Sequence, residues 1–149
     1  DPKDPTLATN RKAFHDYNVL ERFEAGIQLV GTEVKSCRAR AIQLQEGFVK
    51  IEKNQALLYN VHIAGYDFGN RFNHNTKQVR RLLLHKREIL KLGQWLGTKG
   101  GTIIPLRFYL HQGLVKVEIA YCQGKTHADQ RETLRRRETE KDIRRLVKK

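Results

Sequence analysis

Two stretches of alternating apolar residues constrain the fold of this chain more than any other feature. In the clearer stretch, the alternation runs from Leu106 to Leu110, a turn follows at residues 111–113, and the alternation resumes at Val115, Val117, Ile119 and Tyr121. A period of two is typical of a strand with one buried face, so this pattern predicts a β-hairpin. Residues 48–63 predict a second hairpin, with its turn at 53–55 and a return strand that carries Leu57, Tyr59, Val61 and Ile63 on one face.

A long strand precedes both hairpins. Residues 17–29 alternate as well, with Gly26 predicted to mark a bend or bulge, and one face carries Tyr17, Val19, Phe23, Ala25, Ile27 and Leu29. Thr32 is predicted to cap a short helix that packs against the sheet through Val34, Cys37, Arg38 and Ala41. Pro105 cannot donate to a β-ladder, which predicts that it lies at a sheet edge or at the start of a strand.

Between the hairpins, the sequence predicts a loop at residues 65–75, a helix at 77–96 and a glycine-rich loop at 97–101. The predicted helix has an apolar stripe of Val79, Leu82, Leu83 and Leu90, and cations lie outside that stripe: Lys77, Arg80, Arg81, Lys86, Arg87 and Lys91. A basic face of this kind either follows a row of phosphates or is simply solvated.

Five or six short strands with an inserted helix predict a mainly β fold with accessory helices. The natural architecture is a small closed or nearly closed barrel, OB-like in type. We expect residues 1–9, which hold two of the three prolines, to be a flexible lead-in and residues 10–124 to form the barrel.

Residues 125–149 form a basic tail with ten Lys or Arg, five Asp or Glu and only five apolar residues. Such a segment buries too little apolar surface to offset the entropy of ordering it. We therefore expect the tail to be disordered when free and helical once a polyanion neutralises it.

The charge balance points to RNA as the polyanion. The chain carries a formal net charge of +13, of which the tail contributes +5, so +8 remains on residues 1–124. A membrane partner is not expected, because the chain lacks an apolar run of about 18 residues and lacks a segment that pairs a basic face with a broad apolar one. Cys37 and Cys122 lie far apart, which predicts small core residues and neither a metal site nor a cofactor.

No catalytic motif stands out. Six histidines are scattered along the chain, and the loop at 97–101 does not satisfy a phosphate-binding Gly-x-x-x-x-Gly-Lys-Ser/Thr motif. A metal-independent ribonuclease that uses His15 or His62 remains an alternative, as does a structural ribosomal protein. Residues 10–17 combine cations with rings, and these residues either bind phosphates and stack on unpaired bases or form an entry segment whose Phe14 and Tyr17 are core.

In order along the chain, several motifs together resemble the small protein B (SmpB) family, the tmRNA-binding proteins of bacterial trans-translation. They are N-R-K-A-F-H-D-Y at 10–17, F-E-A-G-I at 23–27, G-T-E-V-K-S at 31–36, R-L-L-L-H-K-R-E at 81–88, I-P-L-R-F-Y at 104–109 and V-K-V-E-I-A at 115–120. The resemblance implies an OB-like barrel that binds the tRNA-like domain of tmRNA and carries it to a stalled ribosome. The tail would enter the empty mRNA channel and fold there into a helix.

The resemblance also implies roles for individual residues. Asn10, Glu24, Leu83 and His85 match positions tied to tmRNA recognition, and we add basic and aromatic neighbours from the same region: Arg11, Lys12, Tyr17, Lys35, Arg80, Arg81 and Lys86. His15 matches a histidine near the 16S rRNA decoding region. The tail residues expected to face the ribosome are Lys125, Asp129, Arg131, Arg135, Arg136, Arg137, Lys141, Arg144 and Arg145.

The tail departs from the family pattern at Thr126 and Gln130, where the family commonly has lysines. The resemblance therefore implies fewer contacts of the tail with rRNA at these two positions, and Arg135 to Arg137 can compensate for them. By resemblance, the protein is a monomer with one copy per tmRNA and no catalytic residues. It would act in the bacterial cytoplasm, or in the plastid stroma if it is a processed organelle protein.

Overall fold

The computed structural model describes residues 5–65 and 74–124. The expected disorder and helix of the tail, and most of the loop expected at 65–75, lie outside these residues. Among the described residues, no helix is long and apolar enough to cross a membrane.

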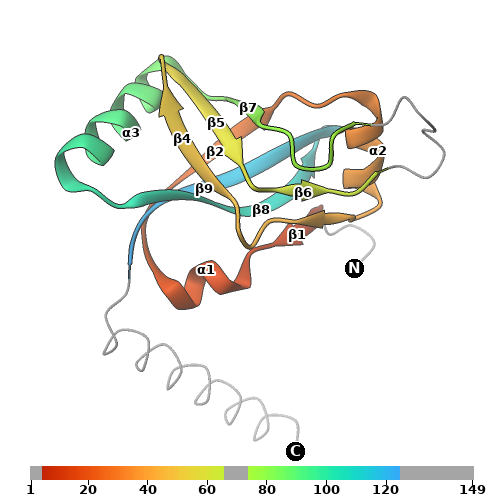
Figure 1. The fold of residues 1–149 in the computed structure, drawn as a ribbon, viewed down its shortest axis with the longest axis horizontal. Helices are drawn as coiled ribbons and strands as arrows, with labels where there is room; N and C mark the ends of the chain where they lie inside the picture. Colours follow the sequence, from red (N-terminus) through yellow and green to blue (C-terminus); the bar gives the residue numbers. More distant parts are fainter. Residues whose placement is uncertain (1–4, 66–73, 125–149) are drawn as a thin grey trace, which may run out of the picture.

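The described chain is mainly β and its main sheet closes on itself. The strands follow the order β1 (Thr6–Thr9), β8 (Thr102–His111), β4 (Phe48–Glu52), β5 (Gln55–Tyr59), β7 (Arg80–Leu83), β2 (Tyr17–Ile27) and β9 (Leu114–Gly124). An additional pairing of β8 with β9 closes all strands except β1 into a ring (Figure 1). Two short strands, β3 (Ile42–Gln43) and β6 (His62–Ile63), pair separately. The predicted OB-like barrel is confirmed.

Two bulges decide which residues enter the barrel. In β2 the register with β9 shifts between Val19 and Glu21, so Leu20 is the extra residue, and Gly26 is paired normally. In β8 the register shifts between Pro105 and Arg107. Of the two alternatives predicted for Gly26, the bulge was therefore wrong. The predicted place of Pro105 was also wrong, because a bulge in the middle of a strand accommodates a residue without an N–H donor.

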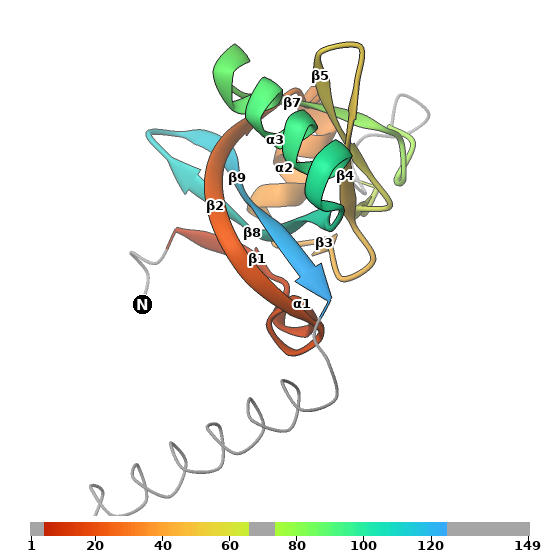
Figure 2. The ribbon, with the colours of Figure 1, turned by 90° about the vertical axis from the view of Figure 1, so that its left-hand side faces the viewer.

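Each bulge moves the alternation to the opposite face, which divides the apolar residues of β2 and β8 between two clusters. Phe23, Ala25 and Phe108 belong to the barrel interior. Ile104 and Leu106 belong to a second cluster outside the barrel, where Tyr17 and Val19 also pack and where Ala13 of α1 (Arg11–Asp16) is buried. The second cluster fixes α1 beneath the sheet, and Figure 2 shows β2 curving from α1 around the barrel.

Two helices lie at opposite ends of the barrel (Figure 1). Cys37 of α2 (Gly31–Arg38) is part of the interior cluster, and so is Leu92 of α3 (Lys86–Lys99). The predicted helix at 77–96 was wrong in its first half, because residues 80–83 form β7 and only Leu82 of the predicted apolar stripe is buried. The helix begins at Lys86 and continues through most of the predicted loop at 97–101. The chain leaves it at Gly100 and Gly101, which both have positive φ.

Smaller corrections follow from the backbone. In the hairpin at residues 48–63, the turn lies at Lys53 and Asn54, and Asn60 has a φ of 59° and breaks the return strand. As a result, Ala56 and Leu58 face inward in place of Leu57 and Tyr59. The predicted lead-in is part of the sheet from Thr6 onward, because β1 pairs with β8.

Candidate RNA-binding surface

Three of the four residues expected to recognise tmRNA line one shallow pocket. Glu24 comes from β2, Leu83 from the end of β7, and His85 from the position that precedes α3. The other lining residues are Gly26, Leu84, Glu88 and Lys116. The pocket therefore presents a carboxylate, an imidazole, an ammonium group and an apolar side chain at one place, although these residues come from three separate parts of the chain.

The pairing of β2 with β7 sets the position of Leu83. Gly26 and Leu83 are paired residues of the two strands, and a Cβ atom at Gly26 would lie 3.2 Å from the Leu83 Cβ. A side chain at residue 26 would therefore push against Leu83. Leu83 is 47% exposed, which is unusual for a leucine in a closed barrel and makes it available to a ligand.

The first turn of α3 sets the position of His85. The backbone N–H of His85 donates to Glu88 Oε1 at 3.1 Å, and the N–H of Glu88 donates to the His85 carbonyl at 2.9 Å. This reciprocal contact engages the backbone of His85 and leaves its side chain exposed. Arg81 and Lys86 are exposed on either side of the segment, so cations flank the pocket.

Glu24 lies on the charged outer face of the sheet. Its Cα partner on β9 is Glu118, so two carboxylates face each other across the strands. Glu118 is compensated by Arg22 at 3.3 Å and by Arg107 at 3.6 Å. Glu24 instead accepts a hydrogen bond from the hydroxyl of Tyr109. Burial raises the pKa of Tyr109 to about 12, and the hydrogen bond to Glu24 and the charge of Glu24 add to the shift. Tyr109 therefore remains a neutral donor that orients the Glu24 carboxylate.

A second group of predicted residues lies at the other end of β2. Tyr17 begins β2 and Gly26 is nine residues further along, which corresponds to about 30 Å of strand. Arg11 and Lys12 are exposed on α1, and His15 Nδ1 lies 2.8 Å from Asp16 Oδ1. Because Tyr17 pairs with Gly124, the last described residue lies beside α1. The structure thus separates this group from the pocket and places α1, with His15, beside the end of β9.

Asn10 has a structural position and not the surface position that direct RNA contact requires. It is 1% exposed, and its side chain accepts from the Ala13 N–H at 3.2 Å as the N-cap of α1. Its amide donates to the carbonyl of Pro105 at 3.0 Å and to that of Leu44 at 3.4 Å. Asn10 therefore holds α1 against the β8 bulge.

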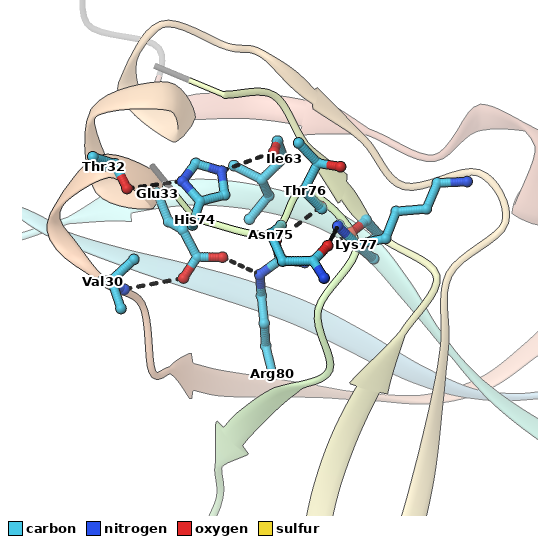
Figure 3. A network of polar contacts seen from close by, with 10 residues as sticks. Val30, Thr32, Glu33, Ile63, His74, Asn75, Thr76, Lys77 and Arg80 are labelled. Carbon is cyan, nitrogen blue, oxygen red and sulfur yellow. Dashed lines mark hydrogen bonds and ion pairs between the residues drawn. The ribbon is translucent and has the colours of Figure 1, made fainter. Parts of the chain in front are cut away.

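Arg80 is likewise buried, at 2% exposed, and is removed from the expected RNA contacts. Its Nε donates to Glu33 Oε2 at 2.5 Å (Figure 3). Its Nη atoms donate to the carbonyls of Val61 at 2.8 Å and Thr76 at 3.0 Å. Glu33 Oε1 accepts from the Val30 N–H at 3.0 Å. This pair connects α2 to the start of β7, the strand that carries Leu83 at its end.

A histidine extends the same network. His74 Nε2 donates to the Ile63 carbonyl at 2.9 Å, and Nδ1 lies 2.8 Å from the Thr32 hydroxyl (Figure 3). Thr32 was predicted to cap α2. The N-cap is Val30 instead, and the Thr32 hydroxyl contacts His74. Lys35, the remaining predicted RNA contact in this region, is exposed on α2.

The two cysteines are buried and unpaired, as their positions in the sequence predicted. Burial raises the pKa of Cys37 to about 12 and that of Cys122 to about 11. Within residues 5–65 and 74–124, no three His, Cys, Asp or Glu side chains are grouped so that they could hold a metal ion.

Sequence reasoning missed several residues on this surface. Lys116 lines the pocket, and Arg22, Arg107 and Glu118 form the charged row beside it. The motif V-K-V-E-I-A at 115–120 could have indicated Lys116 and Glu118. The polar members of an alternating strand occupy the face opposite the core, so both side chains are expected on the outer face of the sheet.

Comparisons with known proteins extend over nearly the whole chain. A family model described as SmpB protein matches residues 7–149. An SsrA-binding protein of Levilactobacillus brevis is 55% identical over 97% of this chain and 92% of its own length. An SsrA-binding protein of Caldanaerobacter subterraneus is 48% identical over 95% of this chain and 90% of its own length. A solved structure described as "tmRNA-SmpB: a journey to the center of the bacterial ribosome" aligns with a TM-score of 0.69 and 39% identity, covering 89% of this chain and 96% of that one.

Proposed function

This chain belongs to the SmpB family, and from that membership we propose that it binds tmRNA and delivers it to stalled ribosomes in trans-translation. The observation that carries the proposal is the convergence of Glu24, Leu83 and His85 in one pocket. Leu83, at the end of β7, and His85 lie two residues apart, and Glu24 comes from the distant strand β2. The barrel therefore brings together the positions that the family resemblance assigns to tmRNA.

The chemistry of the pocket suits RNA. The Glu24 carboxylate only accepts hydrogen bonds, so its partners are base amino groups or 2′-hydroxyls of the RNA. Arg81, Lys86 and Lys116 provide cations for phosphates. Leu83 provides an apolar surface against a ribose or a base. Together these groups recognise a folded RNA at a defined position, whereas the net positive charge alone attracts any polyanion.

The two ends of β2 have separate tasks in this proposal. The pocket end holds the tRNA-like domain of tmRNA. The α1 end presents His15 to the decoding region of 16S rRNA, and the tail, which begins there, enters the mRNA channel. The separation of about 30 Å along β2 allows both contacts to exist at once. One monomer per tmRNA is sufficient for this arrangement.

The protein acts by binding and not by chemistry in this proposal. It brings together two RNA partners, and the transfer reactions belong to the ribosome. The cytoplasm of a bacterium is the compartment in which tmRNA and ribosomes meet, and we place the protein there.

A binding titration tests the proposal. We expect the full chain to bind the tRNA-like domain of a tmRNA with an affinity that falls steeply between 50 and 200 mM salt, because about 6–10 phosphate contacts are screened. Leu83→Ala should raise the Kd about tenfold, because the loss of most of an apolar side chain from the contact removes about 1.4 kcal/mol. Leu90→Ala is the matched control, because Leu90 is 53% exposed on the surface of α3 and does not line the pocket. Equal affinity for any RNA duplex, or no effect of Leu83→Ala, would contradict the proposal.

A further inference from the structure

An apolar notch adjoins the pocket, and apart from Leu83 none of its lining residues was predicted from the sequence to contact RNA. Its walls are Ile27 at the end of β2, Leu29 just beyond it, Val34 of α2, and the tip of the β8–β9 hairpin at residues 113–115. It shares Gly26, Leu83 and Lys116 with the pocket of Glu24 and His85. The two hollows therefore form one continuous surface with an apolar part and a polar part.

Two leucines line this notch and remain open to solvent. Leu83 is 47% exposed and Leu114 is 61% exposed. Gly26 and Gly113 also line the notch, and neither residue adds a side chain to it. Exposed leucines around a hollow are a feature of interaction sites.

The rim of the notch is cationic. Lys116 lines the notch directly, and Arg38 Nη2 donates to the Gly113 carbonyl at 3.2 Å. Arg81 is exposed on β7, two residues before Leu83. An apolar protein partner would have to cover these cations, and lysine is depleted in the centres of protein interfaces. A flat apolar group that is attached to phosphates matches both the apolar walls of the notch and its cationic rim.

We infer that the notch holds an unpaired nucleobase of the bound RNA. The base would lie between the leucine side chains, its phosphates would contact Lys116 and Arg38, and its polar edge would face the side where Glu24 accepts hydrogen bonds. This inference rests on the proposed function and adds a specific contact to it. The specificity of the protein for a folded RNA with an exposed base then depends on Leu114 as well as on the residues of the pocket.

The first test is the affinity of a Leu114→Ala variant for the tRNA-like domain of a tmRNA. We expect the Kd to rise about five- to tenfold, in proportion to the apolar surface removed. Leu114→Met, which keeps that surface, should bind as the wild type does. Leu20→Ala is the matched control, because Leu20 is 56% exposed at the other end of β2.

The salt dependence separates the apolar contact from the ionic ones. For Leu114→Ala, the plot of log Kd against log salt should be shifted with the same slope as for the wild type. For Lys116→Gln, the slope should decrease by about 0.7–0.9, the loss of one phosphate contact. A changed slope for Leu114→Ala would mean that the residue acts through neighbouring charges, which would overturn the inference.

Methyl NMR of the full chain bound to the same RNA identifies the occupant. We expect nuclear Overhauser effects between the Leu114 methyl groups and protons of a nucleobase. Contacts with ribose protons only, or unmoved Leu114 signals, would overturn the inference.

The outcomes also distinguish this inference from the proposed function. If the wild-type chain fails to bind the tRNA-like domain, the proposed function fails. If the wild type binds and Leu114→Ala binds equally well, only the notch is refuted. A Leu114→Ala variant that binds RNA normally but fails to deliver it to ribosomes would assign the notch to a protein partner. This outcome would also refute the inference that the notch holds a nucleobase.

Discussion

At the scale of single residues, the outer face of the sheet sets the direction of Glu24. Its cross-strand neighbour is another carboxylate, which by itself would push Glu24 away. Arg22 and Arg107 neutralise that neighbour, and the buried Tyr109 hydroxyl donates to Glu24. An exposed glutamate on an RNA-binding surface thereby obtains a defined orientation before the RNA arrives.

A Tyr109→Phe variant tests this arrangement. Because burial raises the pKa of Tyr109 to about 12, the folded protein keeps this phenol neutral while an unfolded chain ionises it near pH 10. Tyr109 thus stabilises the fold below about pH 10, and this contribution is lost as the pH rises from about 10 to 12. A titration followed at 295 nm should show a late tyrosine step in the wild type that is absent in Tyr109→Phe. An unchanged late step would assign it to another tyrosine.

At the scale of elements, the Glu33–Arg80 pair fixes β7 against α2. Both side chains are buried, and each polar atom of the contact has a named partner in the backbone or in the other side chain. Removal of one partner would leave an uncompensated charge in the interior, which costs far more than the pair itself contributes.

We therefore expect Arg80→Met to lower the free energy of unfolding by about 3–5 kcal/mol. The exposed Lys12–Glu46 pair, at 3.3 Å, provides the control, and Glu46→Gln should change stability by less than about 1 kcal/mol. Urea unfolding followed by circular dichroism measures both variants. Equal and small effects in the two variants would show that the buried pair does not hold β7.

Much of each element was predictable from the sequence, but its faces were not. Alternation revealed both hairpins and the long strand β2. The bulge at Leu20 left one interruption of the alternation, at Glu21, and the bulge at Pro105–Arg107 left none. The apolar residues continue through both bulges and change faces there, so the alternation alone did not report the change. In the same way, R-R-L-L was predicted as part of a helix, since a four-residue strand beside a true helix is too short to establish its own period.

At the scale of the whole molecule, the closed barrel keeps the pocket and α1 apart. The proposed function assigns tmRNA to the first and the ribosome to the second. We therefore expect deletion of residues 125–149 to leave the affinity for the tRNA-like domain within about twofold and to abolish tagging on stalled ribosomes. The twofold margin allows for lost nonspecific attraction, since the remaining chain is still basic.

Filter binding and an in vitro tagging reaction measure the two effects. A matched control replaces the tail by an uncharged Gly/Ser segment of equal length, which separates the loss of charge and sequence from the loss of length. If the affinity for the tRNA-like domain disappeared with the tail, the tail would be an RNA clamp and the division of tasks along β2 would be wrong.

The sequence by itself determined the class of fold, the basic character of the protein and the family to which it belongs. Each of these depends on local periodicity, on composition or on motif order, which are properties of the chain before it folds. Only the tertiary structure decided that Arg80 and Asn10 are buried, that Glu24, Leu83 and His85 meet, and that a notch with Leu114 lies beside them. These features arise because barrel closure brings distant strands into register, and neither charge nor motif reports which neighbours a closed sheet will provide.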